Sequence, residues 1–332
     1  MLARPGRLSS RTGALRSGYA RLATRLVSLE PLRVPLVYQE PRPGMRLGKY
    51  IKPPSHFQYD VLDASAKHQM QIFNGRDLEL AGSLQTMGFT LYASPTDAEN
   101  FKDDGAVLQH YYPSMRRLIK EVSGAQQVLI FDHIVRQAPT EAVQRVHCDF
   151  TEASARSTLE QISDHGVYSE MRKRMLDTAE VSHLMGQSMT FFNVWRSIDV
   201  SPVQQYPLAL CDARTVSSSN RVHYEILHPI YSGRESENYS LRWEDTHKWY
   251  CFPGMTKDEC IIFAQFSRSG DAPLGFHTSF VDPSAAIDAR ERRSIETRGV
   301  AFFGNELESA DVLHLKVKVK GGKLVSKLSP HE

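Results

Sequence analysis

The second half of the chain contains the apolar runs MTFFNVW (189–195), YPLALC (206–211), HKWYCF (247–252), ECIIFAQF (259–266), GFHTSF (275–280), RSIETRGVAFF (293–303) and VLHLKVKV (312–319). Turn residues separate these short runs, as is typical of β-strands rather than of long helices. Seven or more short strands of this kind favour a β-sandwich or a jelly roll. The predicted fold class is therefore mainly β with α, with a double-stranded β-helix (jelly roll) core and flanking helices.

Two helical segments and two further strands are predicted before these runs. Residues 95–124 and 152–187 have helical character, and Gly124 is a stop signal for the first of them. The short apolar stretch VLIFDHIV (128–135) and residues 145–151 are of the strand type. The candidate N-caps are Ser94 or Thr96 for the first helix and Thr151 or Ser154 for the second.

The charge of the chain is distributed unevenly along its length. The net charge of the whole chain is only +2, but residues 1–33 hold seven Arg and one Glu, which leaves a slightly acidic remainder. An Arg-rich, acid-poor start is typical of a mitochondrial presequence or of a disordered basic extension. We therefore expect a basic tail or presequence over 1–33 and a single catalytic β-barrel domain over 34–332. Within this domain, the Pro-rich residues 34–60 are predicted to be an extended surface arm.

Composition also bears on partners and location. A nearly neutral body is not typical of a nucleic-acid binder, and no run of 18 apolar residues is present that could span a membrane. A small-molecule substrate is the only partner predicted, and no oligomeric state is predicted. The four cysteines form no C-x-x-C pair, which indicates buried free thiols in a reducing compartment: Cys148, Cys211, Cys251 and Cys260. A cytoplasmic location is expected, with a mitochondrial one as the alternative.

The sharpest local motif is RVHCDF (145–150), which contains His147 and Asp149. Residues i and i+2 of a strand project to the same face, so these two side chains are expected to point together. An imidazole beside a carboxylate supplies two of the three ligands of the facial triad in non-haem Fe(II) oxygenases. The motif therefore predicts a metal site that needs a second histidine from a later strand.

Among the thirteen histidines, His277 has the best setting for this third ligand, because it lies in the short apolar run GFHTSF. His133 precedes the H-x-D motif and is expected to be a hydrogen-bonded core histidine, which leaves it as the reserve ligand. His223 and His228 lie in a polar, turn-rich stretch that suits surface positions.

A 2-oxoglutarate cosubstrate would need a cation for its distal carboxylate, and the Arg fork binds carboxylate in a bidentate way. Strand alternation from residue 292 to residue 298 places Arg292, Ser294, Glu296 and Arg298 on one face. Arg298 is the favoured residue for binding this carboxylate, because the apolar stretch VAFF follows shortly after it. Arg292 and Ser294 are the next candidates.

Several separated blocks carry a resemblance to a known family: VLIFDHIVR, RVHCDFTEASAR, FFNVWRSI, YPLALCDARTV, HKWYCFPGMTKDEC, FHTSFVDP and RSIETRGVAFF. Over about residues 55–304 the chain resembles the fungal hydroxylase/desaturase family, which includes a gibberellin desaturase and an aspergillic-acid pathway hydroxylase. That family is related to a bacterial cephamycin methoxylation component, which was historically described as methyltransferase-like.

The resemblance implies an Fe(II)/2-oxoglutarate-dependent oxygenase that uses O2 to hydroxylate or desaturate a small-molecule secondary metabolite. The family's metal-ligand pattern falls on His147, Asp149 and His277, and its basic strand falls on Arg292 and Arg298. The family usually has an acidic residue after the position of Arg292, whereas this chain has Arg293. The resemblance therefore leaves open which arginine binds the cosubstrate.

The NVWR stretch supplies Asn193, Trp195 and Arg196, which would either line the substrate pocket or form a structural network. The structural interpretation is favoured, with Trp195 in the core and Arg196 paired to Asp212 or another acid. Two alternative functions remain: a methyltransferase or methoxylation-pathway component, which needs a Gly-rich loop that the sequence does not convincingly supply, and a non-catalytic ligand-binding barrel.

Overall fold

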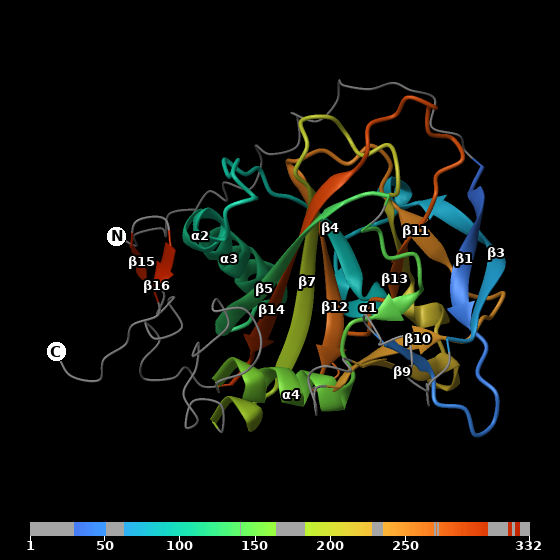
Figure 1. Cartoon of the computed structure of the whole chain (residues 1–332), viewed down its shortest axis with the longest axis horizontal. Helices are drawn as coiled ribbons and strands as arrows, with labels where there is room; N and C mark the ends of the chain where they lie inside the picture. Colours follow the sequence, from blue (N-terminus) through green and yellow to red (C-terminus); the bar gives the residue numbers. More distant parts are fainter. Residues whose placement is uncertain are drawn as a thin grey trace, which may run out of the picture. The chain divides into compact units, whose positions relative to one another are not determined.

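The fold is built from two curved β-sheets with helices packed outside them, as the computed structural model in Figure 1 shows. The larger sheet has nine strands, in the spatial order β1 (Leu32–Gln39), β3 (Ser65–Asn74), β11 (Trp249–Cys251), β8 (Leu208–Cys211), β13 (His277–Ser279), β6 (His147–Cys148), β10 (Glu235–Leu241), β9 (Arg221–Leu227) and β2 (Gly48–Tyr50). The smaller sheet has five strands, β4 (Phe89–Ala93), β12 (Glu259–Ser267), β7 (Met189–Ser197), β14 (Arg293–Phe302) and β5 (Gln127–Gln137). A separate hairpin pairs β15 (Lys318–Lys320) with β16 (Lys323–Val325).

The structure describes residues 30–50, 63–139, 141–163, 183–227, 235–268, 270, 272–304, 318–320 and 323–325. Most of the predicted tail, residues 1–29, therefore lies outside the described residues. No helix in the described ranges is long and apolar enough to cross a membrane.

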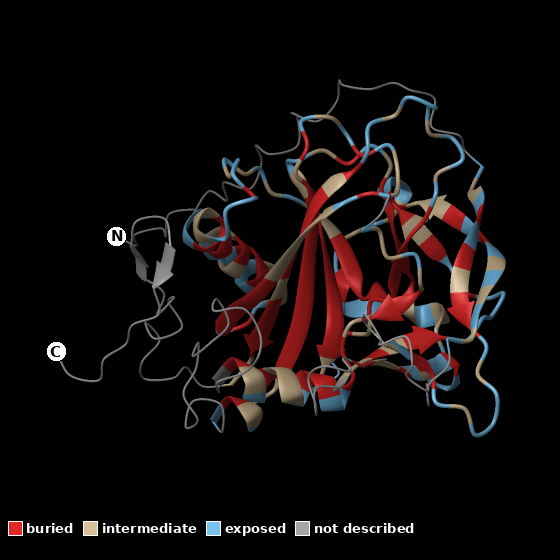
Figure 2. Ribbon diagram, in the orientation of Figure 1, coloured by how far each residue is buried: buried red, intermediate tan, exposed pale blue. Residues whose placement is uncertain are grey.

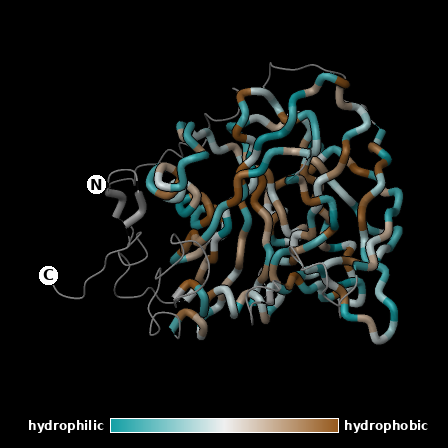
Figure 3. The backbone as a smooth tube through the Cα atoms, in the orientation of Figure 1, coloured by the Kyte–Doolittle hydropathy of each residue, from teal (hydrophilic) through white to brown (hydrophobic). Residues whose placement is uncertain are grey.

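The two sheets share an apolar core in which Trp195 of β7 and Phe263 of β12 pack with Leu210 of β8. Nearly every residue of the central strands of the five-stranded sheet is buried (Figure 2). Hydrophobic residues concentrate along these strands (Figure 3). Six of the seven apolar runs predicted to be strands thus form β7, β8, β11, β12, β13 and β14, and the predicted jelly-roll class is confirmed. Residues 312–317 of the seventh run lie outside the described residues.

The predicted surface arm begins as part of the larger sheet instead. β1 pairs antiparallel with β3, and Val34, Leu36 and Tyr38 are almost fully buried. The Pro-rich composition was misleading here because β1 is an edge strand, where a residue such as Pro35 removes no hydrogen bond from the interior of the sheet. Residues 51–60 of the predicted arm lie outside the described residues.

The first predicted helix is shorter than expected. It consists of α2 (Asp104–Ala106), a π-helical turn η2 (Val107–Tyr111) and α3 (Tyr112–Ser123). It begins after Asp103, whose carboxylate accepts hydrogen bonds from two backbone amides of the first turn, so the predicted caps Ser94 and Thr96 are wrong. Gly124 ends it in a left-handed conformation with a φ of 72°, as predicted.

The helix α3 packs its apolar face, including Met115 and Ile119, in one buried cluster with Ile130 of β5 and Ile262 of β12. The second predicted helix starts as α4 (Glu152–Ser163), whose Leu159 packs in a cluster with the other face of the five-stranded sheet. The Thr151 hydroxyl accepts a hydrogen bond from the Ser154 amide, at 3.2 Å, as a cap should. Residues 164–182 of this prediction lie outside the described residues.

Short helices complete the described elements: α1 (Ser83–Met87), η1 (Gly75–Asp77), η3 (Ala213–Thr215) and η4 (Ser218–Asn220). The four cysteines are buried and free, as predicted.

Candidate metal centre

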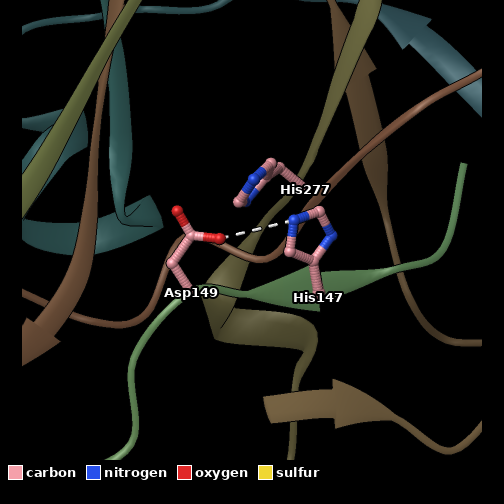
Figure 4. A group of neighbouring side chains, drawn as sticks. All are labelled: His147, Asp149 and His277. Carbon is pink, nitrogen blue, oxygen red and sulfur yellow. Dashed lines mark ion pairs between the residues drawn. The ribbon is translucent and has the colours of Figure 1, made fainter. Parts of the chain in front are cut away.

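Three side chains with metal-ligating atoms meet where β6 and β13 lie side by side. His147 of β6 and His277 of β13 are direct partners in the sheet. Asp149 follows β6, and one ligating atom from each of the three residues lies within 4.8 Å of the other two (Figure 4). His147 Nε2 and Asp149 Oδ1 are 3.5 Å apart. This group is therefore compact enough to hold one metal ion.

The local backbone differs from the predicted strand over 145–151. β6 contains only His147 and Cys148, and Asp149 lies in a bend. The Asp149 amide donates a hydrogen bond to the side-chain oxygen of Gln265, at 2.7 Å, which fixes the bend against β12. The two side chains point together as predicted, but a side-chain contact with another strand holds the second one in place.

Both histidines are oriented by backbone carbonyls. His147 Nδ1 lies 2.7 Å from the carbonyl oxygen of Arg145, and His277 Nδ1 lies 3.2 Å from that of Gly275. Because a carbonyl only accepts, each Nδ1 carries the proton and donates it. The Nε2 lone pair of each ring is therefore free to bind a metal, which is how second-sphere hydrogen bonds orient metal-bound histidines.

The two oxygens of Asp149 have different partners. Oδ2 accepts a hydrogen bond from Asn193 Nδ2 at 2.8 Å and forms an ion pair with Arg298 Nη2 at 2.9 Å. Burial alone would raise the pKa of Asp149, but the charge of Arg298 is the largest of the effects that outweigh burial and hold that pKa far below its usual range. The carboxylate stays ionised, and Oδ1 faces His147 for metal binding.

Burial lowers the pKa of His147 well below its usual range, and the neighbouring His277 lowers it further. The ring is therefore neutral at neutral pH, which is the form that binds a metal. Two imidazoles and one carboxylate form the donor set that suits non-haem iron.

Arg298 forms ion pairs with Asp149 and with two further acids. Its guanidinium lies 2.9 Å from Asp149, 3.0 Å from Glu296 and 3.2 Å from Asp132. Its position opposite Asp132 in the β14 and β5 pairing explains this network. The charge of Arg298 is therefore already balanced within the protein.

Arg292 is buried without an acidic partner in the described part of the chain. It is only 4% exposed, and its Nη1 donates to the carbonyl of Tyr206 at 2.5 Å and to the hydroxyl of Ser279 at 3.1 Å. Its Nε has no hydrogen-bond partner among the described residues. Burial lowers the pKa of Arg292 to about 10, which still leaves it positively charged at neutral pH. Ser294, on the same side of β14, is also buried.

The NVWR residues divide between two faces of β7. Asn193 faces the metal ligands through its bond to Asp149, and the ring of Trp195 lies 5.6 Å from the guanidinium of Arg292. Arg196 points to the other face and donates to the backbone oxygen of Ser94 at 2.8 Å. The predicted acidic partner of Arg196 is wrong, since Asp212 pairs with Arg214 instead.

The other candidate histidines lie outside the metal centre. His133 accepts or donates a hydrogen bond with the Tyr112 hydroxyl at 3.0 Å, as expected of a core histidine. His223 is exposed, as predicted, although it lies in strand β9, and His228 is outside the described residues.

Sequence reasoning missed Gln265 as a support for the metal centre. Its amide group is fully buried, donates to the carbonyls of Ala264 and Gly275, and accepts from the Asp149 amide. Gln265 therefore connects the backbone segments that carry Asp149 and His277. The signal was a lone amide side chain within the otherwise apolar run ECIIFAQF.

A family model described as Oxidoreductase/YMDC permease-like domain matches residues 36–302. The chain belongs to this family.

Several relatives are similar in sequence over most of this region. The Hydroxylase/desaturase efuI of Hormonema carpetanum is 29% identical over 68% of this chain and 80% of its own length. The Fe(II)/2-oxoglutarate-dependent dioxygenase nvfI of Aspergillus novofumigatus is 29% identical over 71% of this chain and 84% of its own length. A solved structure of the iron and alpha-ketoglutarate-dependent endoperoxidase NvfI is 23% identical and covers 83% of this chain and 99% of its own. Its TM-score of 0.69 shows that the two proteins share the fold.

Proposed function

We propose that the chain is an Fe(II)- and 2-oxoglutarate-dependent oxygenase that hydroxylates or desaturates a small molecule of secondary metabolism. The observation that carries this proposal is the group His147, Asp149 and His277, with two oriented imidazoles and an ionised carboxylate. The names of the relatives, hydroxylase/desaturase and 2-oxoglutarate-dependent dioxygenase, support the same chemistry.

His147 Nε2, Asp149 Oδ1 and His277 Nε2 would hold the iron, because their other polar atoms are already hydrogen-bonded. Iron bound in such a site supplies the oxidation, in which O2 and 2-oxoglutarate are consumed and hydrogen is removed from a C–H bond of the substrate. The protein holds the ligands in place: Asn193 and Arg298 fix Asp149, and Gln265 fixes the bend that carries it.

We infer that Arg292, with Ser294 beside it, binds the distal carboxylate of 2-oxoglutarate. Arg298, which the sequence favoured, is already paired with three carboxylates, whereas Arg292 has none in the described ranges. A buried cation without an acidic partner gains most from an incoming carboxylate. Trp195 lies beside Arg292 and would form one wall of this subsite.

The two alternative functions are not favoured. A methyltransferase or methoxylation component would have no use for a metal, and so it does not explain why His147 Nε2, His277 Nε2 and Asp149 Oδ1 are left free to bind one. A non-catalytic barrel leaves unexplained why Asp149 is kept ionised by Arg298. The four buried thiols agree with the expected reducing, cytoplasmic compartment.

The function is tested by adding Fe(II) and 2-oxoglutarate to the metal-free protein under anaerobic conditions. The proposal predicts a weak visible charge-transfer band that requires both additions, because the cosubstrate chelates iron at the open positions left by three protein ligands. His147→Ala should remove this band, while His223→Ala, at an exposed position of β9, should keep it. A wild-type protein without the band, or a band unchanged in His147→Ala, would contradict the proposal.

A further inference from the structure

A second set of polar side chains lies on the same face of the larger sheet as the metal ligands. Residues paired directly across strands, and alternate residues along one strand, lie on one face of a sheet. His147 pairs with Ser240 of β10, and Asn238 is two residues away on the same strand. Asn238 in turn pairs with Tyr224 of β9. The face that begins at His147 therefore continues to Asn238 and Tyr224.

Arg145 places its guanidinium on this face. The guanidinium lies 3.8 Å from the ring centroid of Tyr224, and Nη2 reaches the side-chain oxygen of Asn238 at 3.4 Å. Its backbone carbonyl is the acceptor that orients His147. Arg145 is therefore attached to the metal centre through its own main chain.

The guanidinium of Arg145 forms no ion pair with an acid among the described residues. Its Nη1 is buried without a hydrogen-bond partner in the described ranges, and so is the hydroxyl of Tyr224. Asp63 and Asp149 act on Arg145 through their charge and raise its pKa, against the larger lowering by burial. The Asp63 carboxylate already accepts a hydrogen bond from Gln39 at 3.1 Å. The half-buried Arg145 guanidinium therefore has an unpartnered Nη1 donor on this face, beside the buried Tyr224 hydroxyl, which Asp63 also influences.

Further cations surround this position. Lys49 of β2 is the sheet partner of Ile226, which is two residues from Tyr224, so Lys49 lies on the same face at its exposed edge. Burial and then the charge of Arg145 lower the pKa of Lys49, whereas the charge of Asp63 raises it and that of Arg136 lowers it again. The cations that act at this edge of the face thus outnumber its one acid, Asp63.

We propose that the small-molecule substrate carries a carboxylate, which Arg145 and the Tyr224 hydroxyl bind beside the metal ligands, with Lys49 at the rim. The proposal rests on the proposed function. A planar carboxylate matches the Arg fork, which binds it through two parallel hydrogen bonds. Arg292 directly precedes β14 of the other sheet, so the substrate and 2-oxoglutarate each have a cation of their own.

The test uses 4-(trifluoromethyl)benzoate and its methyl ester as probes. The protein is loaded with Mn(II) in place of Fe(II) and saturated with 2-oxoglutarate, and the probes are titrated by fluorine NMR. The proposal predicts that the acid binds at least about tenfold more tightly than the ester, because only the acid pairs with Arg145. Paramagnetic broadening of the bound acid, absent with Zn(II), would place it near the metal.

Arg145→Gln should remove the preference for the acid, while Arg156→Gln, an exposed position on α4, should keep it. Lys49→Gln should weaken acid binding about threefold, and it tests the same site if Arg145→Gln does not fold. Equal affinities for acid and ester, equal effects of Arg145→Gln and Arg156→Gln, or displacement of the acid by 2-oxoglutarate would overturn the proposal. If Mn(II) and 2-oxoglutarate bind normally, such a result leaves the oxygenase function intact. If Mn(II) does not bind, the oxygenase function fails, and this inference fails with it.

Discussion

His277→Gln is expected to lower Fe(II)-dependent conversion of 2-oxoglutarate to succinate by more than about 100-fold. Loss of a residue that only supports a metal ligand typically costs 10–100-fold in metal affinity or activity, and His277 is placed as a ligand itself. Its Nε2 is free because Nδ1 donates to the Gly275 carbonyl, and the Gln amide cannot restore that arrangement. Succinate formation, together with Mn(II) binding followed by electron paramagnetic resonance, measures the effect.

The matched control is His223→Gln, which changes the same residue type in β9, where the side chain is exposed and pairs with Glu237. This variant should keep both Mn(II) binding and turnover. The placement of the metal centre would be wrong if His277→Gln bound Mn(II) as tightly as His223→Gln.

Arg292→Gln is expected to raise the KM for 2-oxoglutarate by about 100-fold or more. Removing one partner of a buried ion pair costs about 3–5 kcal/mol, and about 1.4 kcal/mol corresponds to a tenfold change. Metal affinity should change little, because Arg292 bonds Tyr206 and Ser279 rather than a metal ligand. Steady-state kinetics with varied 2-oxoglutarate, alongside Mn(II) titration, separates the two effects.

Two other arginines serve as comparisons. Arg290→Gln removes an exposed side chain that pairs with Asp199, and its KM should be close to that of the wild type. Arg298→Gln should weaken metal binding, because Arg298 holds Asp149. A larger rise in the KM for 2-oxoglutarate for Arg298→Gln than for Arg292→Gln would contradict this assignment and indicate that Arg298 binds the cosubstrate.

The short apolar runs were sufficient to predict the strands that build the core, because a buried strand needs only a few apolar residues between turns. The edge strand β1 was not predicted because buried and exposed residues alternate along it and because it contains Pro35, a residue more typical of loops. An edge position tolerates both features, and pairing with β3 is a long-range property that no local pattern carries.

The grouping of His147 with Asp149 could be predicted because residues two apart in an extended segment project to one face, although Asp149 itself lies in the bend after β6. Which arginine binds 2-oxoglutarate could not be predicted from the sequence. Alternation correctly placed Arg292 and Arg298 on one side of the sheet, but the acids that pair with Arg298 come partly from β5 and from the bend after β6. Only the register that sets Arg298 opposite Asp132 reveals that its charge is balanced.

The central claim is that one iron ion is bound by His147, Asp149 and His277. The most direct measurement is anomalous diffraction at the iron edge from crystals grown anaerobically with Fe(II) and 2-oxoglutarate. The account predicts one strong peak at bonding distance from His147 Nε2, Asp149 Oδ1 and His277 Nε2. A peak at other residues, or no peak at these three in crystals that contain iron, would contradict it.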